Sequence, residues 1–334
     1  MHATLLISLA LPFAATFQPV PPDLTTPPTP RTTPDDSLQP WRSDLRSASL
    51  LGDSQPTTLF HLSAAAAPSL ARDSRGTIYA AFQWYPQSEP ANAGSIALQR
   101  SFDNARAWTP PRALSIRNLP GSLLPPTDPV LAVLPDDSLR LYFLAADRAD
   151  PRTPALYSAL SRDGGESFTF EPGQRFRPER GSTCAIARRD AQWLLIVSDA
   201  VGPVRATSTD GLTFTLAGRI DANVQGQWTG SLIADGDAFT FLGQSGNGGA
   251  IWRSTSTDGK TWSSPTSLDL RGSRPTAVRP EAGRWFFLVS SLPAPVRTTP
   301  PAEPSIPGPP PRTIPLEPPA KPRVPEVPGL PRPR

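Results

Sequence analysis

Residues that build cross-links and metal sites are scarce in this chain. Its 334 residues include one cysteine and two histidines. The single cysteine, Cys184, excludes an intrachain disulfide, and we expect it to be a small buried residue on an inner strand. His2 and His61 are too few for a histidine-based zinc site or a Ser-His-Asp triad. The sequence therefore predicts no metal site.

Signatures of cofactors, nucleic acid and membranes are also missing. The sequence contains neither a phosphate-binding loop nor a dinucleotide fingerprint, so no cofactor is expected. Nothing in it is typical of a nucleic-acid-binding module, so no nucleic-acid partner is expected either. Apart from the N-terminus, no stretch approaches the ~18 consecutive apolar residues of a membrane span. We therefore expect no transmembrane span.

The N-terminal segment has the pattern of an export signal. An apolar run from Leu5 to Ala15 ends in small residues near Ala14–Thr16, although no Lys or Arg precedes it. A short apolar run with a small-residue end is typical of a secretory signal peptide. We expect residues 1–16 to be a signal peptide and the protein to be extracytoplasmic, either secreted or periplasmic.

Proline marks the two ends of the chain. Residues 19–40 contain 8 prolines and residues 293–334 contain 17, out of 45 in total. Such segments have too few apolar residues for a core and favour extended polyproline-II structure. We assign residues 17–40 to a linker and residues 293–334 to a disordered tail.

The tail also carries most of the net charge. It has six basic residues against three glutamates, an excess equal to the formal charge of +3 of the whole chain. The tail is either a solvated spacer or a segment that makes weak contact with an anionic polymer. The rest of the chain is close to neutral.

One short motif occurs four times. The copies span Ser101–Trp108, Ser161–Phe168, Ser208–Phe214 and Ser256–Trp262, and each contains an aspartate two residues after its serine. From aspartate to aspartate the steps are 60, 47 and 48 residues. Repeats at this spacing, set between runs of strand-forming residues, are typical of the blades of a β-propeller.

The composition of the motif fits a tight turn between two strands. Gly165, Gly211 and Gly259 can adopt the positive φ that such a turn requires. The aspartate can accept hydrogen bonds from backbone N–H groups of its own turn. The closing aromatic ring can pack between neighbouring blades. The four turn aspartates are Asp103, Asp163, Asp210 and Asp258.

The motif resembles the Asp-box of the sialidase-like (BNR-repeat) β-propellers. This resemblance implies an all-β propeller in which the boxes are structural turns on the face away from the ligand. The motif therefore identifies the fold but does not identify the ligand or the activity.

The blades can be counted from the second strand of each repeat. Five runs qualify, namely Thr77–Phe82, Leu139–Leu144, Trp193–Val197, Ala238–Leu242 and Arg284–Val289. The last unit reaches Pro293 before it can form its outer strands. Two strand-like runs, Arg42 to Leu51 and Pro56 to Ser63, have no unit of their own and can complete that blade. We predict a five-bladed β-propeller over residues 41–292, with six blades as the alternative.

The ligand face should lie opposite the boxes. Because the boxes join the third and fourth strands of a blade, the loops between strands two and three emerge on the other face, with the links that lead into strand one. Aromatic rings and amides there suit a sugar, since rings stack on pyranose faces and amides bind hydroxyls. For Trp84 and Trp228, packing between blades is an equally weighted alternative. The candidate ligand-binding residues are Trp84, Tyr85, Gln227, Trp228, Gln244 and Asn247.

The family resemblance also implies residues for catalysis. Sialidases bind the substrate carboxylate with three arginines and use an Asp acid and a Tyr nucleophile activated by a Glu. The four tyrosines of this chain all lie in its first half. Arg274 is the only arginine whose context fits one of the three positions. An ordinary sialidase mechanism is therefore not expected.

Five-bladed glycosidases instead use carboxylates around the central axis. Asp128 and Glu179 precede adjacent blades, whereas the first blade offers only Ala64–Ala67 where a third acid would be expected. The candidate catalytic groups are thus Asp128, Glu179 and Arg274, with capping of a strand as an alternative role for Asp128.

The sequence as a whole favours binding over catalysis. We predict an exported, monomeric propeller that binds a carbohydrate or glycoconjugate on its loop face without ordinary sialidase catalysis. One alternative is a diverged exo-sialidase-like glycoside hydrolase, and another is a protein-interaction scaffold.

Overall fold

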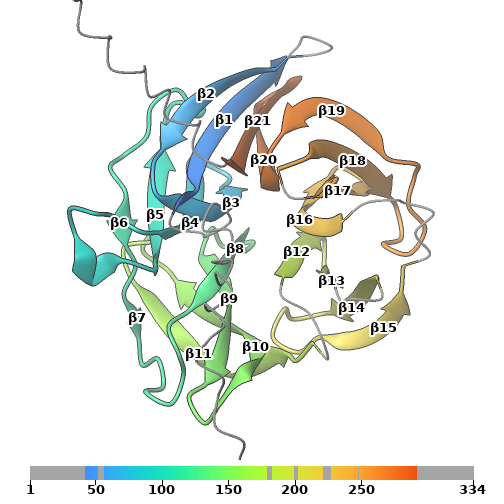
Figure 1. Cartoon of the computed structure of the whole chain (residues 1–334). Helices are drawn as coiled ribbons and strands as arrows, with labels where there is room; N and C mark the ends of the chain where they lie inside the picture. Colours follow the sequence, from blue (N-terminus) through green and yellow to red (C-terminus); the bar gives the residue numbers. More distant parts are fainter. Residues whose placement is uncertain are drawn as a thin grey trace, which may run out of the picture. The chain divides into compact units, whose positions relative to one another are not determined.

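The described part of the chain folds into a ring of five sheets. The structure is a computed structural model, and it describes residues 42–51, 56–178, 183–198, 202–220, 227–246 and 248–291. The inner strand of each sheet contacts the inner strands of its two neighbours, which closes the ring (Figure 1). The prediction of a five-bladed β-propeller is confirmed, and the six-bladed alternative is wrong. The predicted signal peptide, linker and tail lie outside the described residues.

Four blades follow one another along the chain. The strands of each blade are given below from the innermost to the outermost. Blade 1 consists of β3 (Ala65–Arg72), β4 (Ile78–Trp84), β5 (Ser95–Ser101) and β6 (Arg112–Ala113). Blade 2 consists of β8 (Thr127–Val133), β9 (Leu139–Asp147), β10 (Asp150–Ser161) and β11 (Phe168–Phe176), with β7 (Ile116–Arg117) added in parallel at its outer edge. Blade 3 consists of β12 (Thr183–Arg189), β13 (Gln192–Ser198), β14 (Pro203–Ser208) and β15 (Thr215–Arg219). Blade 4 consists of β16 (Gln227–Asp235), β17 (Ala238–Gln244), β18 (Ala250–Ser256) and β19 (Thr266–Arg271).

Blade 5 is assembled from both ends of the described chain. Its inner strands are β20 (Ser273–Glu281) and β21 (Arg284–Ser291), and its outer strands are β1 (Asp44–Leu51) and β2 (Thr57–Leu62). Strand β1 pairs antiparallel with β21 along its whole length, as the adjoining blue and red ribbons show (Figure 1). The predicted closure by the two N-terminal runs is confirmed. It pairs the backbone groups of β21 that would otherwise form an exposed sheet edge.

The second strands are buried because both of their faces meet neighbouring blades. All seven residues of β4 are buried. Strand β13 is buried except at its first and last residues, and β17 is buried except at its first residue. The hydrophobic clusters accordingly join side chains of adjacent blades. Cys184 belongs to one of them and is 6% exposed. Burial raises the pKa of its thiol to about 12, so the predicted inert apolar role agrees with its surroundings.

Each of the four boxes joins the third and fourth strands of its blade. In the last box, Asp258 Oδ1 accepts hydrogen bonds from the backbone N–H groups of Lys260 and Thr261, both at 2.8 Å. It also accepts one from Ser256 Oγ, which in turn accepts the Gly259 N–H at 2.8 Å. The aspartates of the other boxes, Asp103, Asp163 and Asp210, accept hydrogen bonds in the same pattern.

The boxes also hold neighbouring blades together. In the third box, Gly211 has a φ of 71°, and a Cβ there would lie only 2.7 Å from the hydroxyl oxygen of Tyr142 in blade 2. Tyr142 donates a hydrogen bond to the Gly211 carbonyl at 2.8 Å, and its ring packs on that of Phe214. Glycine therefore serves both the turn and the close approach of the preceding blade. In the first box, which has Ala105 in place of this glycine, the alanine takes the same left-handed conformation, with a φ of 66°.

We expect Asp258→Ala to lower the free energy of unfolding by about 1 kcal/mol, because it leaves the two turn N–H groups without their acceptor. Those hydrogen bonds, from Thr261 and then Lys260, lower the pKa of Asp258 to about 2. The stabilisation is thus complete above the unfolded-state pKa of about 3.9 and is lost as the pH falls toward 2. Urea titrations of wild type and variant between pH 7 and pH 2 measure both effects.

The exposed Asp237, which lies outside the boxes, provides the control variant Asp237→Ala, whose stability should stay close to that of wild type. A loss of ligand binding in folded Asp258→Ala, with unchanged stability, would show that the boxes are on the ligand face.

Candidate functional site

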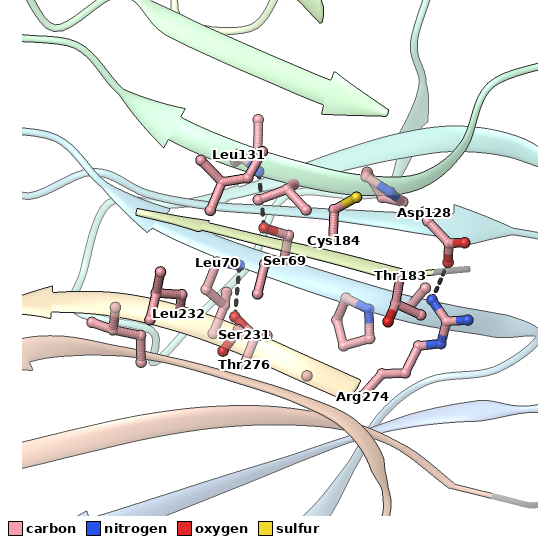
Figure 2. Close-up of a pocket in the computed structure, with 18 residues that line it drawn as sticks. Ser69, Leu70, Asp128, Leu131, Thr183, Cys184, Ser231, Leu232, Arg274 and Thr276 are labelled. Atoms are coloured by element: carbon pink, nitrogen blue, oxygen red, sulfur yellow. Dashed lines mark hydrogen bonds and ion pairs between the residues drawn. The ribbon is translucent and has the colours of Figure 1, made fainter. Parts of the chain in front are cut away.

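The five inner strands surround a narrow cavity on the axis of the ring. Its volume is about 50 Å³, and every inner strand contributes to its lining (Figure 2). A space of this size holds water molecules and is far below the roughly 300 Å³ at which small-molecule sites begin. A ligand as large as a sugar ring would therefore fit only at the mouth of the cavity and not inside it.

Hydroxyl groups inside the cavity tie three blades together. Thr276 Oγ1 on β20 accepts the Leu70 N–H of β3 at 3.1 Å. Ser69 Oγ on β3 accepts the Leu131 N–H of β8 at 2.9 Å (Figure 2). These bonds fix the relative positions of blades 5, 1 and 2, which supply the residues at the mouth. The sequence offered no signal for them, because each joins strands that are far apart in the chain.

A shared irregularity shapes the start of three inner strands. Ala67, Asp128 and Arg274 have φ values of 52°, 52° and 50°, and each is followed by a proline. The pairing register shifts at each of these points. Left-handed backbone is costly for residues with a side chain, and a following proline favours extended backbone instead. Strain of this kind is frequent at functional sites, and these three positions are structural equivalents in blades 1, 2 and 5.

Two of these positions form an ion pair at one end of the cavity. The Arg274 guanidinium donates a hydrogen bond to Asp128 Oδ1 (Figure 2). Blades 2 and 5 are not neighbours, so the pair reaches across blade 1, where the equivalent residue is the small Ala67. Burial raises the pKa of Asp128, although the charge of Arg274 opposes this effect. The structure thus brings together two of the predicted site residues and gives Asp128 a role beyond capping a strand.

Tyr85 is the third predicted residue at the mouth. Its backbone N–H donates to the Ala64 carbonyl at 2.8 Å, which holds the segment after β4 against the start of β3. Burial raises the pKa of the Tyr85 phenol, the carboxylate of Asp128 adds to the rise, and Arg274 opposes it. The phenol therefore lies within electrostatic range of the ion pair.

The two predicted tryptophans are buried in the cores instead. Trp228 is 4% exposed, and its ring centroid lies 4.6 Å from Phe241, 5.4 Å from Trp252 and 5.3 Å from Trp262. Trp84 is 7% exposed and belongs to the cluster between blades 5 and 1. Neither offers an open ring face for a sugar to stack on. We therefore correct the stacking interpretation, and packing between blades explains both residues.

The Gln244 side chain holds the backbone of Arg274 in position. It is 3% exposed, its Oε1 accepts the Arg274 N–H at 2.6 Å, and its Nε2 donates to the Gly246 carbonyl at 3.1 Å. Its amide holds the strained backbone of Arg274 rather than facing a ligand, which corrects the prediction of direct binding. Glu179, Asn247 and the side chain of Gln227 lie outside the described part of the structure.

A second hollow, which the sequence did not indicate, lies beside Ala64. It has a volume of about 690 Å³, within the range of small-molecule sites. It forms between the beginning of β1, the end of β2 and the segment that follows β4. Its lining residues are Arg42, Asp44, Leu62, Ser63, Ala64, Trp84, Pro86, Gln87 and Ser88. We call this hollow the side groove.

Comparisons with known proteins find similar structures but no similar sequence. No protein-family model matches the chain, and no curated protein matches its sequence. Among solved structures, a family 117 glycoside hydrolase from the marine bacterium Zobellia galactanivorans, Zg3597, is 12% identical, with a TM-score of 0.50 over 76% of this chain and 92% of its own. The GH43 beta-xylosidase/alpha-arabinofuranosidase CoXyl43, from a compost microbial metagenome, is 13% identical, with a TM-score of 0.50 over 67% of this chain and 84% of its own.

A sialidase is also similar in structure. The Hadza microbial sialidase Hz136 is 18% identical, with a TM-score of 0.49 over 68% of this chain. The match spans 52%, or about half, of the length of that sialidase. At these identities the likeness concerns the fold alone. The described residues form a five-bladed β-propeller, as the four boxes predicted, and glycoside hydrolases share this fold.

Proposed function

We propose that this protein is an exported carbohydrate-binding propeller, with its ligand at the mouth of the axial cavity and without ordinary sialidase catalysis. The observation that carries the proposal is the ion pair between Arg274 and Asp128. Among the described residues that line the cavity, Asp128 is the only acid and Arg274 the only base. The signal-like residues 1–16 support export.

The chemistry of this pair fits binding better than bond cleavage. A sialidase arginine must be free to bind a substrate carboxylate, whereas the charge of Arg274 is already matched by Asp128. Glycoside hydrolysis needs two carboxyl groups flanking the bond, and the equivalent position in blade 1 is Ala67. The remaining N–H groups of Arg274 and the free lone pairs of Asp128 can still bind sugar hydroxyls. The glycoside hydrolases that share the fold, one of them in complex with xylotriose, support a carbohydrate ligand.

A diverged glycoside hydrolase is the second candidate. The observation that favours it is the carboxyl of Asp128 at the end of the cavity, whose pKa is raised by burial, the direction that a general acid requires. Glu179, which precedes blade 3, would have to supply the other carboxyl group. On this alternative, Asp128→Asn and Glu179→Gln abolish turnover while binding persists.

The deciding experiment applies the purified full chain to a glycan array and to a panel of fluorogenic glycosides that includes a sialoside. We expect glycan binding without turnover. Arg274→Ala should weaken that binding at least tenfold, because it removes the main donor at the mouth. Arg162→Ala, at a position whose side chain is 72% exposed and lies on the box face, should leave it unchanged.

Two results would overturn the proposal. Glycoside cleavage that disappears in Glu179→Gln would establish the hydrolase. Absence of both binding and turnover would leave a scaffold that contacts a protein partner.

A further inference from the structure

We infer that the side groove is a second subsite, which binds the next sugar units of a neutral oligosaccharide whose terminal unit lies at the axial mouth. This inference rests on the proposed function and extends it to the class of ligand. It is carried by the size of the groove, its neutral lining and its continuity with the mouth.

The axial cavity and the side groove differ greatly in volume. The axial cavity, at about 50 Å³, admits no sugar, whereas the side groove, at about 690 Å³, has room for more than one ring. A ligand that exceeded one unit would therefore extend sideways over the surface. The groove is the hollow that such an extension would meet next to Ala64.

The lining of the groove is polar without net charge. Its exposed side chains include the hydroxyls of Ser63 and Ser88 and the amide of Gln87. One base, Arg42, is balanced by one acid, Asp44, whose Oδ1 accepts the Ala64 N–H at 3.3 Å. Hydroxyls and an amide supply both donors and acceptors, which is what a ligand rich in hydroxyl groups requires. An anionic polymer would find no excess of positive charge in this lining.

The floor of the groove is apolar. Leu62, Pro86 and Trp84, which is 7% exposed, contribute to it. Sugar rings combine apolar C–H faces with polar rims, so a floor of this kind under a polar rim suits a pyranose or furanose unit. The burial of Trp84 keeps the floor rigid, because its ring is fixed by the core between blades 5 and 1.

The start of β3 joins the groove to the mouth, because Ala64 lines the groove and Ala67, three residues further on, lines the axial cavity. Tyr85, whose neighbours Trp84 and Pro86 also line the groove, donates its backbone N–H to the Ala64 carbonyl at 2.8 Å. One short segment thus borders both hollows. A single oligosaccharide can contact the ion pair with its terminal unit and the groove with the units that follow.

The test is the dependence of affinity on ligand length. Calorimetric titrations of the full chain use neutral xylo- and cello-oligosaccharides from one to four units. We expect the trisaccharide of at least one series to bind at least tenfold more tightly than its monosaccharide. Gln87→Trp, which fills the groove, should remove this gain and leave monosaccharide affinity unchanged.

A matched variant controls for the substitution itself. Gln192→Trp replaces another exposed glutamine, at the start of β13 on the box face, and should keep the full gain with length. Ser63→Trp fills the groove from the link between β2 and β3 and provides a second variant should Gln87→Trp fold poorly. Thermal unfolding of all three variants confirms that they are folded.

The outcomes separate this inference from the proposed function. Equal affinity for one and three units, or a gain that persists in both groove variants, overturns the subsite and leaves binding at the mouth intact. Absence of binding at every length, in a protein that also binds nothing on the glycan array, overturns both.

Discussion

Glu171→Ala should lower the free energy of unfolding by roughly 3 to 5 kcal/mol, because it leaves a buried arginine without its counter-charge. Glu171 accepts from both Arg140 Nη2, at 3.0 Å, and Ser158 Oγ, at 2.6 Å. The side chain of Arg140 is only 8% exposed, and it also donates to the carbonyl of Asp210 in the neighbouring blade, at 3.0 Å. Losing the carboxylate therefore disturbs the contact between blades 2 and 3 as well as the pair itself. Urea denaturation followed by tryptophan fluorescence measures the change.

Glu166→Ala provides the matched control. This glutamate also pairs with arginine, namely Arg100 and Arg112, but its side chain is 51% exposed. Exposed pairs of this kind contribute about 0 to 1 kcal/mol. Glu171→Gln should fall between the two variants, since it keeps the shape and an acceptor but not the charge. Equal losses for Glu171→Ala and Glu166→Ala would show that burial does not govern the energetics of these pairs.

Trp228→Ala should cost roughly 3 to 5 kcal/mol of stability, the usual range for deleting a large buried aromatic side chain. The ring is 4% exposed and lies among three other aromatic rings of blade 4, so its removal opens a cavity that rigid neighbours cannot fill. Thermal and urea unfolding measure the loss. The folded fraction of the variant should retain the ligand affinity of wild type.

An exposed aromatic residue, Phe102, provides the control for this substitution. Phe102→Ala removes an aromatic ring that is 69% exposed and should change stability by less than about 0.5 kcal/mol. Trp228→Phe should lose less stability than Trp228→Ala, because it preserves most of the ring volume. Lost glycan affinity in Trp228→Ala, with stability unchanged, would restore the stacking role that the burial of this ring argues against.

Local chemistry explains why the boxes could be found in the sequence. The turn around Asp258 is complete within six residues, since its acceptor, its donors and its glycine are neighbours in the chain. A feature that closes locally leaves its pattern in the sequence, and its repetition revealed the blades. The closure of blade 5 followed because the runs from Arg42 to Leu51 and from Pro56 to Ser63 had no blade of their own.

The same argument explains why packing was not distinguished from binding on the face opposite the boxes. Stacking on a sugar and packing between blades both require an aromatic ring near the end of a strand. The sequence therefore could not distinguish the two roles at Trp84 or Trp228. Their burial depends on the neighbouring blade, which the local pattern does not describe. The prediction that Gln244 binds a ligand could not take account of its hydrogen bond to Arg274, 30 residues away.

The sequence by itself determined the repeat, the five blades and the face opposite the boxes, because hydrogen bonds and apolar alternation over a few residues encode them. Only the tertiary structure decided that Asp128 and Arg274, separated by 146 residues, neutralise each other across the mouth. It alone revealed the side groove, whose walls come from the closing blade and from blade 1. Closing the ring brings these distant segments together, and no short-range pattern specifies which side chains then meet.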